Sequence, residues 1–360
     1  MSHNFPYDRL PEFDNHELVS FFSEKKSGLR GFIAIHNTNL GPAVGGTRYR
    51  QYASDIEALR DALNLSKAMT YKCALADVPY GGGKGVIIAH SRRAKTENLL
   101  YAYAQKINLL NGSLHTGEDV GIDEMDMRIL LKKSPFIIGK PNIAGDPSPW
   151  AAKGVFYAIK AALKLALGNS EIAGRVFAIK GLGKVGGELC HLLYENGAII
   201  IAADVDKTKT QSMQKKFPKV KIVRPSEIHK EKVDVYSPCA LGNEFTQTTV
   251  KELRCKIICG GANNQLANGK VGMLLHRKGI LYVPDYLANA GGLINVVAEL
   301  NPKGYNKARV EECVENISNT TEKILNLSQK EKQPTNYIAD MLAEQIFLRT
   351  TKRQTHESNA

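Results

Sequence analysis

The chain has 360 residues, of which 43% are hydrophobic and 23% are charged, as in a folded protein with room for two domains. No apolar run is long enough for a membrane helix and no signal-peptide pattern stands at the start, so we expect a cytoplasmic protein without a membrane partner. The formal net charge is +12, but the basic residues are scattered and no zinc finger or RNA-binding motif occurs. We therefore expect a lysine-rich surface and no nucleic-acid partner.

The six cysteines and nine histidines show no metal-binding pattern. No two cysteines have CxxC spacing and most lie in apolar segments, so we expect reduced core thiols. The histidines are dispersed and form no paired-ligand motif, so we expect no metal.

The N-terminal part of the chain is rich in strand signals. Residues 17–50 contain β-rich runs separated by turn residues, which predicts antiparallel strands. The segment from Leu40 to Arg48 holds three glycines and a proline, which suggests a tight bend beside a ligand. Ser54 and Glu57 have the spacing of a capping box, so a helix should begin there and run towards Tyr71.

The stretch 69–88 carries Lys72 and Lys84 on either side of a glycine run. We expect the run to be a turn whose backbone approaches a ligand closely, followed by a short buried strand. It does not fit a Walker phosphate loop, because Val78 stands where that motif needs glycine and Gly85 where it needs serine or threonine. The two lysines therefore need another explanation.

Helices are predicted next at residues 93–110 and 123–133. The loop between them contains the adjacent acids Glu118 and Asp119, which are unlike core sequence. Asp123 can cap the second helix, which leaves the other two acids unexplained. The prolines in segment 144–149 then interrupt any continuous helix and mark a domain boundary.

A dinucleotide-binding pattern follows this boundary. A strand at residues 175–180 leads directly into Gly181-Leu-Gly-Lys-Val-Gly186 and a helix. In this pattern Gly181 makes the turn, Gly183 admits a pyrophosphate and Gly186 allows close helix packing. A second strand ends in Asp204, where an acid binds ribose hydroxyls and repels a 2′-phosphate, so NAD is expected rather than NADP.

Further strands are predicted at residues 220–223, 233–236, 255–259 and 280–283, and helices at 305–328 and 334–350. Ligands bind outside the carboxyl ends of parallel strands, so the loops after two of these strands should line the cofactor site. The remaining predicted cofactor residues are Lys184, Val185, Cys239, Ala240 and Asn263.

Nine motifs together carry a family resemblance: GPAVGGTR, MTYK, GGGKGVI, EDVG, GDPSP, GLGKVG, SPCALG, GANNQL and PDYLANAGGLINV. In their order and spacing, over about residues 28–300, the chain resembles the leucine/phenylalanine/valine branch of the amino-acid dehydrogenase family that also contains glutamate dehydrogenase. The resemblance implies an α/β fold with an N-terminal mixed-sheet domain and a C-terminal Rossmann domain that face each other across an active-site cleft. It divides the chain into a substrate-binding and dimerisation domain (1–144, completed by 331–360) and an NAD-binding domain (145–330), and it implies a homo-oligomer.

The same resemblance implies NAD-dependent, reversible oxidative deamination of an apolar L-amino acid to a 2-oxo acid and ammonia. Lys72 would bind the substrate carboxylate, Lys84 would be the catalytic lysine, Asp119 its acid/base partner, and Asn264 would lie near the amino group. A neutral lysine can activate the water that attacks the imine, and the nearby charge of Lys72 would favour that neutral form.

The implied substrate contacts are Gly45, Gly46 and the pocket residues Val44, Gly117, Leu293 and Val296. Gly45 and Gly46 would bring the backbone close to the substrate. Gly117 and Leu293 stand where leucine enzymes usually carry Ala and Val, which resembles the phenylalanine and tryptophan enzymes, and a methyl missing at Gly117 would enlarge the pocket. Aliphatic and aromatic substrates both stay open. A third possibility also stays open, a homologue that binds an amino acid and NAD but turns over slowly. It rests on Ala151, which replaces a Thr that usually holds the nicotinamide amide.

Overall fold

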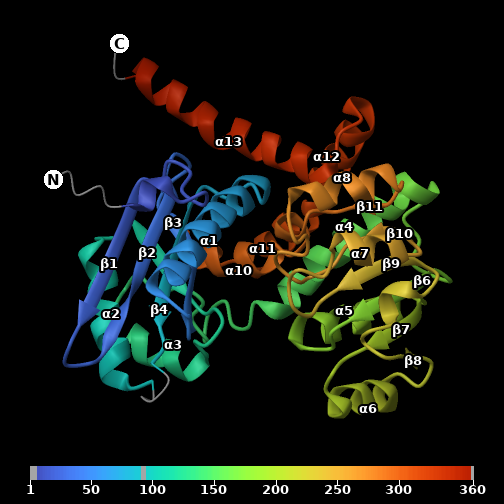
Figure 1. Cartoon of the computed structure of the whole chain (residues 1–360), viewed down its shortest axis with the longest axis horizontal. Helices are drawn as coiled ribbons and strands as arrows, with labels where there is room; N and C mark the ends of the chain where they lie inside the picture. The colour runs from blue at the N-terminus through green and yellow to red at the C-terminus, as the bar shows by residue number, and fades with distance from the viewer. Residues whose placement is uncertain (1–5, 91–94, 358–360) are drawn as a thin grey trace. The chain divides into compact units, whose positions relative to one another are not determined.

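The computed structural model describes residues 6–90 and 95–357, so the predicted helix start at residue 93 lies outside the described residues. The chain forms two units (Figure 1). Unit 1 contains the chain up to Gly145, Val296–Tyr305 and the chain from Ala343 onwards, and unit 2 contains Asp146–Asn295 and Asn306–Leu342. Within the described ranges, no helix is long and apolar enough to cross a membrane.

Unit 1 is built on a mixed sheet with the strand order β1-β2-β4-β3-β5. The strands are β1 (Leu18–Glu24), β2 (Leu29–Asn37), β3 (Ala43–Arg50), β4 (Gly81–Ile88) and β5 (Leu114–Gly117). β2 pairs antiparallel with β1 and β4, whereas β3 lies parallel to β4 and β5. The prediction of antiparallel strands is therefore right for β1 and β2 and wrong for β3. The bend expected in the segment from Leu40 to Arg48 is confined to its start, where Gly41 has a φ of 140°, and the rest of the segment is strand β3.

The glycine run at residues 81–85 lies in β4, the central strand of this sheet, so the predicted turn is wrong. None of these glycines has a positive φ. They lack side chains because neighbouring elements come close: a Cβ on Gly82 would overlap the backbone of Thr70, and one on Gly85 would overlap the hydroxyl of Tyr103. Glycine serves close approach as well as turns, and the local pattern does not distinguish the two.

Helices cover both faces of the unit 1 sheet (Figure 1). Helix α1 (Asp55–Leu75) lies on one face, and α2 (Glu97–Leu109) and α3 (Glu124–Leu131) lie on the other. Both predicted N-caps are confirmed, since the side chains of Ser54 and Asp123 accept the amide hydrogen bonds that begin α1 and α3. Lys72 therefore falls in the last turn of α1, near the C-terminal end as predicted.

Unit 2 contains a six-stranded parallel sheet with the order β11-β10-β9-β6-β7-β8. The strands are β6 (Val176–Lys180), β7 (Ile199–Ala203), β8 (Lys221–Ile222), β9 (Val233–Pro238), β10 (Cys255–Ile258) and β11 (Leu281–Tyr282). All six strands predicted in this part of the chain are present. The order reverses between β6 and β9, as in doubly wound nucleotide-binding sheets, so the α/β fold with a Rossmann-type second domain is confirmed.

The helices that lie wholly in unit 2 are α4 (Ser148–Leu167), α5 (Lys184–Glu195), α6 (Lys207–Lys216), α7 (Gln247–Glu252), α8 (Gly269–Arg277), α9 (Asp285–Ala288), α11 (Lys307–Glu315) and α12 (Ile317–Glu331). Two more, α10 (Gly291–Val297) and α13 (Thr335–Glu357), extend into unit 1.

The single helix predicted at 305–328 is two helices divided at Asn316. Asparagine competes for backbone hydrogen bonds, and the carbonyl of Asn316 accepts a tight i+3 bond from the Asn319 amide at 3.0 Å.

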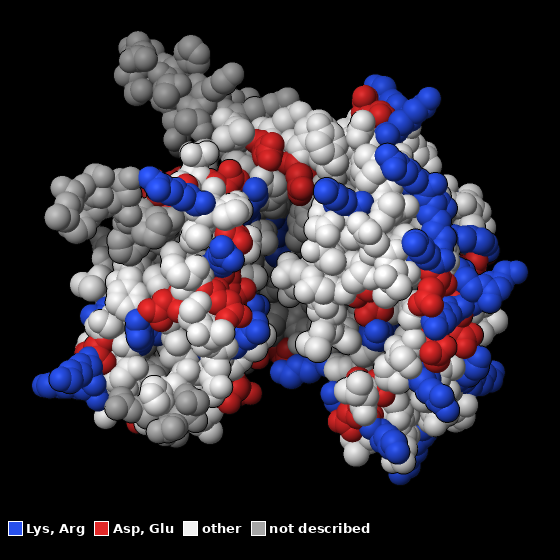
Figure 2. Space-filling view, in the orientation of Figure 1, with Lys and Arg blue, Asp and Glu red and all other residues white. Residues whose placement is uncertain are grey.

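Charged side chains of both signs cover the visible face of both units (Figure 2). Lysine and arginine predominate, in keeping with the formal net charge of +12, and acidic side chains lie among them. Such a mixed surface favours solubility and weakly attracts anionic ligands.

Candidate functional site

Lys84 and Asp119 lie together in unit 1. Lys84 is in β4, is only 5% exposed, and forms an ion pair with the carboxylate of Asp119. Asp119 belongs to the loop between β5 and α3, which packs closely on β3: a Cβ on Gly46 would lie 2.5 Å from the carbonyl oxygen of Glu118. The fold therefore brings together the two residues predicted to be the catalytic lysine and its acid/base partner.

A second cation contacts the same carboxylate. The Arg48 Nε lies 3.4 Å from an oxygen of Asp119, and the Arg48 Nη1 lies 3.0 Å from an oxygen of Asp61. The hydroxyl of Tyr52 donates to that same Asp61 oxygen at 2.6 Å. Arg48 and Asp61 belong to no motif that predicts a role for them, and the one signal in the sequence is a charged residue directly after Thr47, which is buried.

These neighbours keep Asp119 ionised. Burial raises the pKa of the Asp119 carboxyl, but the positive charges of Lys84 and Arg48 outweigh that effect, so the pKa lies below its usual range. The site consequently holds a carboxylate between two cations at neutral pH. Such a carboxylate can accept a proton from a substrate ammonium group placed beside it.

Lys72 is half-buried in the last turn of α1, where the helix dipole favours a cation. The elements that carry Lys72 and Lys84 are tightly packed, because Gly82 leaves no space between β4 and Thr70 of α1. A Cβ on Gly45 would overlap the carbonyl oxygen of Gly83. Protein atoms fill the space next to Gly45, so packing already explains this glycine without a substrate.

The pocket positions differ in what surrounds them. Val44 is fully buried in β3, and Leu293 is 9% exposed in α10. A Cβ on Gly117 would lie 2.6 Å from the carbonyl oxygen of Ile138. The expectation that the methyl missing at Gly117 enlarges a pocket is therefore wrong, because a backbone carbonyl occupies that place. Val296 is half-buried, and it lies 3.7 Å from the Cβ position of Gly139.

In unit 2, the dinucleotide motif forms the turn between β6 and α5. Gly181 has a φ of 97°, and a Cβ on Gly186 would overlap the Gly181 carbonyl oxygen. Gly183 is the N-cap of α5, and no atom lies within 4 Å of its Cβ position. The amide of Leu182 donates to the carboxylate of Asp204 at 2.6 Å, which fixes this acid at the end of β7 beside the turn.

Two loops surround this turn. A Cβ on Gly181 would lie 2.8 Å from the amide of Ala240 and the carbonyl of Cys239, and one on Gly261 would lie 2.6 Å from Val185. The loop that contains Gly261 also carries Asn263 and Asn264. Asn263 accepts a hydrogen bond from Asn289 at 2.7 Å, and Asn264 is exposed and has a φ of 53°.

Two charged groups adjoin the same turn. The Lys180 ammonium donates to both carboxylate oxygens of Glu244, at 3.0 and 2.7 Å, and the hydroxyl of Tyr236 donates to one of them at 2.6 Å. Lys184 is exposed and lies 3.2 Å from a carboxylate oxygen of Asp146. Its expected contact with a pyrophosphate stays a prediction.

The turn fits a dinucleotide. The first amides of α5 lack helical partners, and the helix dipole adds a favourable field for a phosphate group. The open surface at Gly183 admits such a group at close range. Each Asp204 oxygen can accept a ribose hydroxyl in addition to its amide bond.

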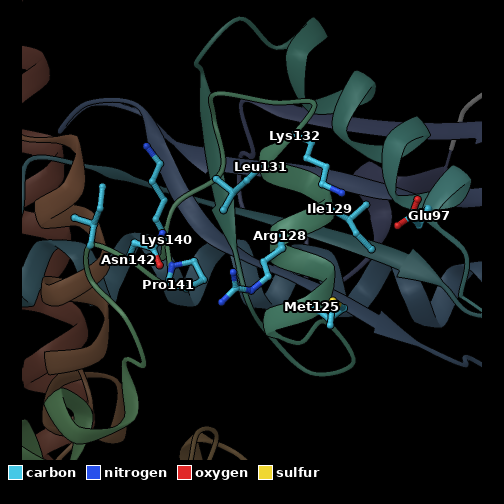
Figure 3. A pocket seen from close by; sticks show the side chains of 10 residues that line it. Glu97, Met125, Arg128, Ile129, Leu131, Lys132, Lys140, Pro141 and Asn142 are labelled. Carbon is cyan, nitrogen blue, oxygen red and sulfur yellow. The ribbon is translucent and has the colours of Figure 1, made fainter.

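An open hollow of about 610 Å³ lies elsewhere in unit 1 (Figure 3). Its lining residues are Glu97, Met125, Arg128, Ile129, Leu131, Lys132, Lys140, Pro141, Asn142 and Ile143. None of the residues predicted for the functional site lines it, so it is not the candidate site. Among the described residues, no group of His, Cys, Asp and Glu is arranged to hold a metal ion.

Two family models match the chain. One is described as the Glu/Leu/Phe/Val dehydrogenase dimerisation domain and matches residues 16–135; the other is described as glutamate/leucine/phenylalanine/valine dehydrogenase and matches residues 203–354. The leucine dehydrogenase of Geobacillus stearothermophilus is 42% identical over 92% of this chain and 90% of its own. The L-tryptophan dehydrogenase of Nostoc punctiforme is 42% identical over 91% and 92%. A crystal structure of L-tryptophan dehydrogenase from Nostoc punctiforme, 40% identical in sequence, superimposes with a TM-score of 0.82 over 94% of this chain and 97% of that one.

Proposed function

This chain belongs to the Glu/Leu/Phe/Val dehydrogenase family, and on that premise we propose that it oxidatively deaminates an apolar L-amino acid to the 2-oxo acid and ammonia, with NAD as hydride acceptor. The observation that carries the proposal is the ion pair between the buried Lys84 and the half-buried Asp119, since an ionised group is rarely buried without a functional or strongly paired role. Relatives named leucine, phenylalanine and L-tryptophan dehydrogenases, at 40–42% identity, support the substrate class.

The roles of the residues follow from charge. Lys72 binds the substrate carboxylate, and Asp119, kept ionised by its neighbours, accepts a proton from the substrate ammonium group. NAD, when bound, would supply the acceptor for the hydride that leaves Cα. Lys84, after releasing its own ammonium proton to solvent, removes a proton from the water that attacks the resulting imine. Asp119 returns its proton to the departing amine. The family resemblance assigns Asn264 a contact with that amino group.

Cofactor choice rests on Asp204. Its carboxylate is fixed beside the dinucleotide turn by the Leu182 amide, and a negative charge there repels a 2′-phosphate. We assign the pyrophosphate to the turn Gly181–Gly186, with Lys184 and Val185 in it. Cys239, Ala240 and Asn263 complete the cofactor contacts, and Ala151 in α4 offers no hydroxyl to the nicotinamide amide.

Leucine-type and aromatic substrates are both retained. Leu293 in place of the usual Val favours the aromatic enzymes, whereas Gly117 carries no weight because the Ile138 carbonyl fills its missing side chain. We also assign the protein to the cytoplasm as a homo-oligomer. Six free cysteines fit a reducing compartment, and the family model for residues 16–135 is described as a dimerisation domain.

The test is formation of the reduced cofactor, NADH from NAD or NADPH from NADP, with a panel of L-leucine, L-isoleucine, L-valine, L-phenylalanine and L-tryptophan. L-glutamate and D-leucine serve as controls. We expect turnover with at least one apolar L-amino acid and NAD, and little with the controls. Absence of turnover across the panel would refute the enzyme assignment, and activity with NADP alone would refute the role of Asp204. The panel also decides between aliphatic and aromatic substrates.

A further inference from the structure

A half-buried arginine lies beside the Lys84–Asp119 pair. The Arg48 side chain is 15% exposed, and its Nε lies 3.4 Å from the Asp119 carboxylate that also pairs with Lys84. Arg48 comes from β3, Lys84 from the adjacent strand β4 and Asp119 from the loop after β5. Three segments of unit 1 thus place one carboxylate between two cations.

Arg48 is held in this position from its other side. Its Nη1 lies 3.0 and 3.2 Å from the two carboxylate oxygens of Asp61 in α1, and Tyr52 donates to Asp61 at 2.6 Å. The guanidinium group therefore bridges two carboxylates, for which its planar fork is suited and a lysine ammonium is not. Burial alone would lower the pKa of Arg48, but Asp119 and Asp61 outweigh it, so the pKa is raised and the guanidinium stays charged.

The two cations beside Asp119 differ in their chemistry. Lys84 exchanges protons in the proposed reaction, so it is uncharged in part of each cycle. An arginine does not lose its proton in proteins. When Lys84 is neutral, Arg48 is therefore the charge that opposes the effect of burial on Asp119.

We propose that Arg48 is a positioning residue that keeps Asp119 in place and ionised, ready to take the ammonium proton of the substrate, when Lys84 is uncharged. This inference rests on the proposed function, because it needs Lys84 to change its charge. It assigns Arg48 the task of directing protons: an ionised Asp119 takes the ammonium proton of the substrate, and neutral Lys84 is left to act on the attacking water. Asp61, which accepts a hydrogen bond from Tyr52, holds the guanidinium group of Arg48 in this position.

The experiment removes the charge of Lys84 permanently and then that of Arg48. Infrared spectroscopy of the full-length variants Lys84→Met and Lys84→Met/Arg48→Gln records the carboxyl stretch of Asp119, which is identified by its loss in Asp119→Asn. In Lys84→Met we expect Asp119 to stay ionised down to about pH 4. In the double variant we expect its protonation midpoint to rise by about one pH unit or more. Equal midpoints in the two variants would overturn the proposal.

Single variants test the same point when the double variant is not folded. Asp61→Asn removes a partner of Arg48 and leaves Asp119 unchanged, so the acidic limb of the pH profile of kcat/KM should move to higher pH. Arg48→Lys should shift this limb less than Arg48→Gln does. Arg128→Gln, which removes an exposed arginine paired with Glu124, is the matched control and should leave the profile unchanged. An acidic limb at the wild-type position in both Asp61→Asn and Arg48→Gln would contradict the proposal. The infrared result needs no turnover, so failure of the proposed function is recognised separately, by an inactive wild type.

Discussion

Replacement of Gly82 by alanine tests how α1 is held against β4. A Cβ at Gly82 would overlap the amide nitrogen and the hydroxyl oxygen of Thr70, and it would lie 2.5 Å from the carbonyl oxygen of Ser66, where ordinary contact begins at 3.4 Å. Backbone atoms of a helix cannot rotate away, so the whole of α1 must shift. Overpacking of a core typically costs about 1–3 kcal/mol, and we expect Gly82→Ala to reach the upper end of this range.

The same shift should reduce catalysis. Lys72 is in α1 and Lys84 is in β4, so separating the two elements moves the carboxylate-binding group relative to the catalytic one. A displacement of about 1 Å in a catalytic constellation can cost about 100-fold in rate. We expect kcat/KM of Gly82→Ala to fall by at least about tenfold.

Thermal unfolding and steady-state kinetics of Gly82→Ala check both effects. At about 2–4 °C for each kcal/mol, the apparent Tm should fall by about 6–12 °C. Gly269→Ala is the matched control, because no atom lies within 4 Å of its Cβ position at the start of α8; it should be neutral or slightly stabilising. If Gly82→Ala were as stable and as active as Gly269→Ala, the account of the glycine run would be refuted.

Three further predictions concern other parts of the chain. Gly117→Ala should lower the apparent Tm by several degrees, since its Cβ meets the Ile138 carbonyl, and should leave the ratio of kcat/KM values for leucine and phenylalanine nearly unchanged; a changed ratio at unchanged Tm would contradict this. Burial lowers the pKa of His36 to about 4, so the unfolded chain binds its proton first and stability should decline by up to about 3 kcal/mol as the pH falls from about 6.5 to 4. Denaturant titrations across this range should show a flatter pH dependence for His36→Gln. Glu244→Gln weakens the link to Lys180, so NADH binding, followed by fluorescence, should weaken by about tenfold; wild-type affinity would show that the link does not support the cofactor site.

The features that the sequence predicted well are local ones. The dinucleotide turn, its helix and Asp204 follow one another along the chain, and Gly186 packs against the carbonyl of Gly181, five residues before it. The N-caps Ser54 and Asp123 were likewise predicted because a cap acts within its own first turn. Such features need no knowledge of which distant segments meet.

The features that the sequence did not reveal depend on tertiary contacts. The glycine run of β4 reads as a turn until Thr70 and Tyr103 are known to lie against it. Arg48 and Asp61 have no local motif, and they matter only because β3, α1 and the loop of Asp119 converge. The space next to Gly117 is likewise decided by a segment beyond α3.

The central claim is that Lys84 carries out the chemistry of an NAD-dependent amino-acid dehydrogenase. The most direct measurement is kcat of Lys84→Ala with the best L-amino acid of the panel, alongside the Kd for NADH. Lys209→Ala, an exposed lysine of α6, is the matched control. Loss of a positioned acid–base group typically costs about 10²–10⁴-fold in rate, so we predict a loss of that size for Lys84→Ala, with NADH affinity and the control unchanged. Turnover of Lys84→Ala within about threefold of the wild type would contradict the claim, since acid–base groups contribute far more than this.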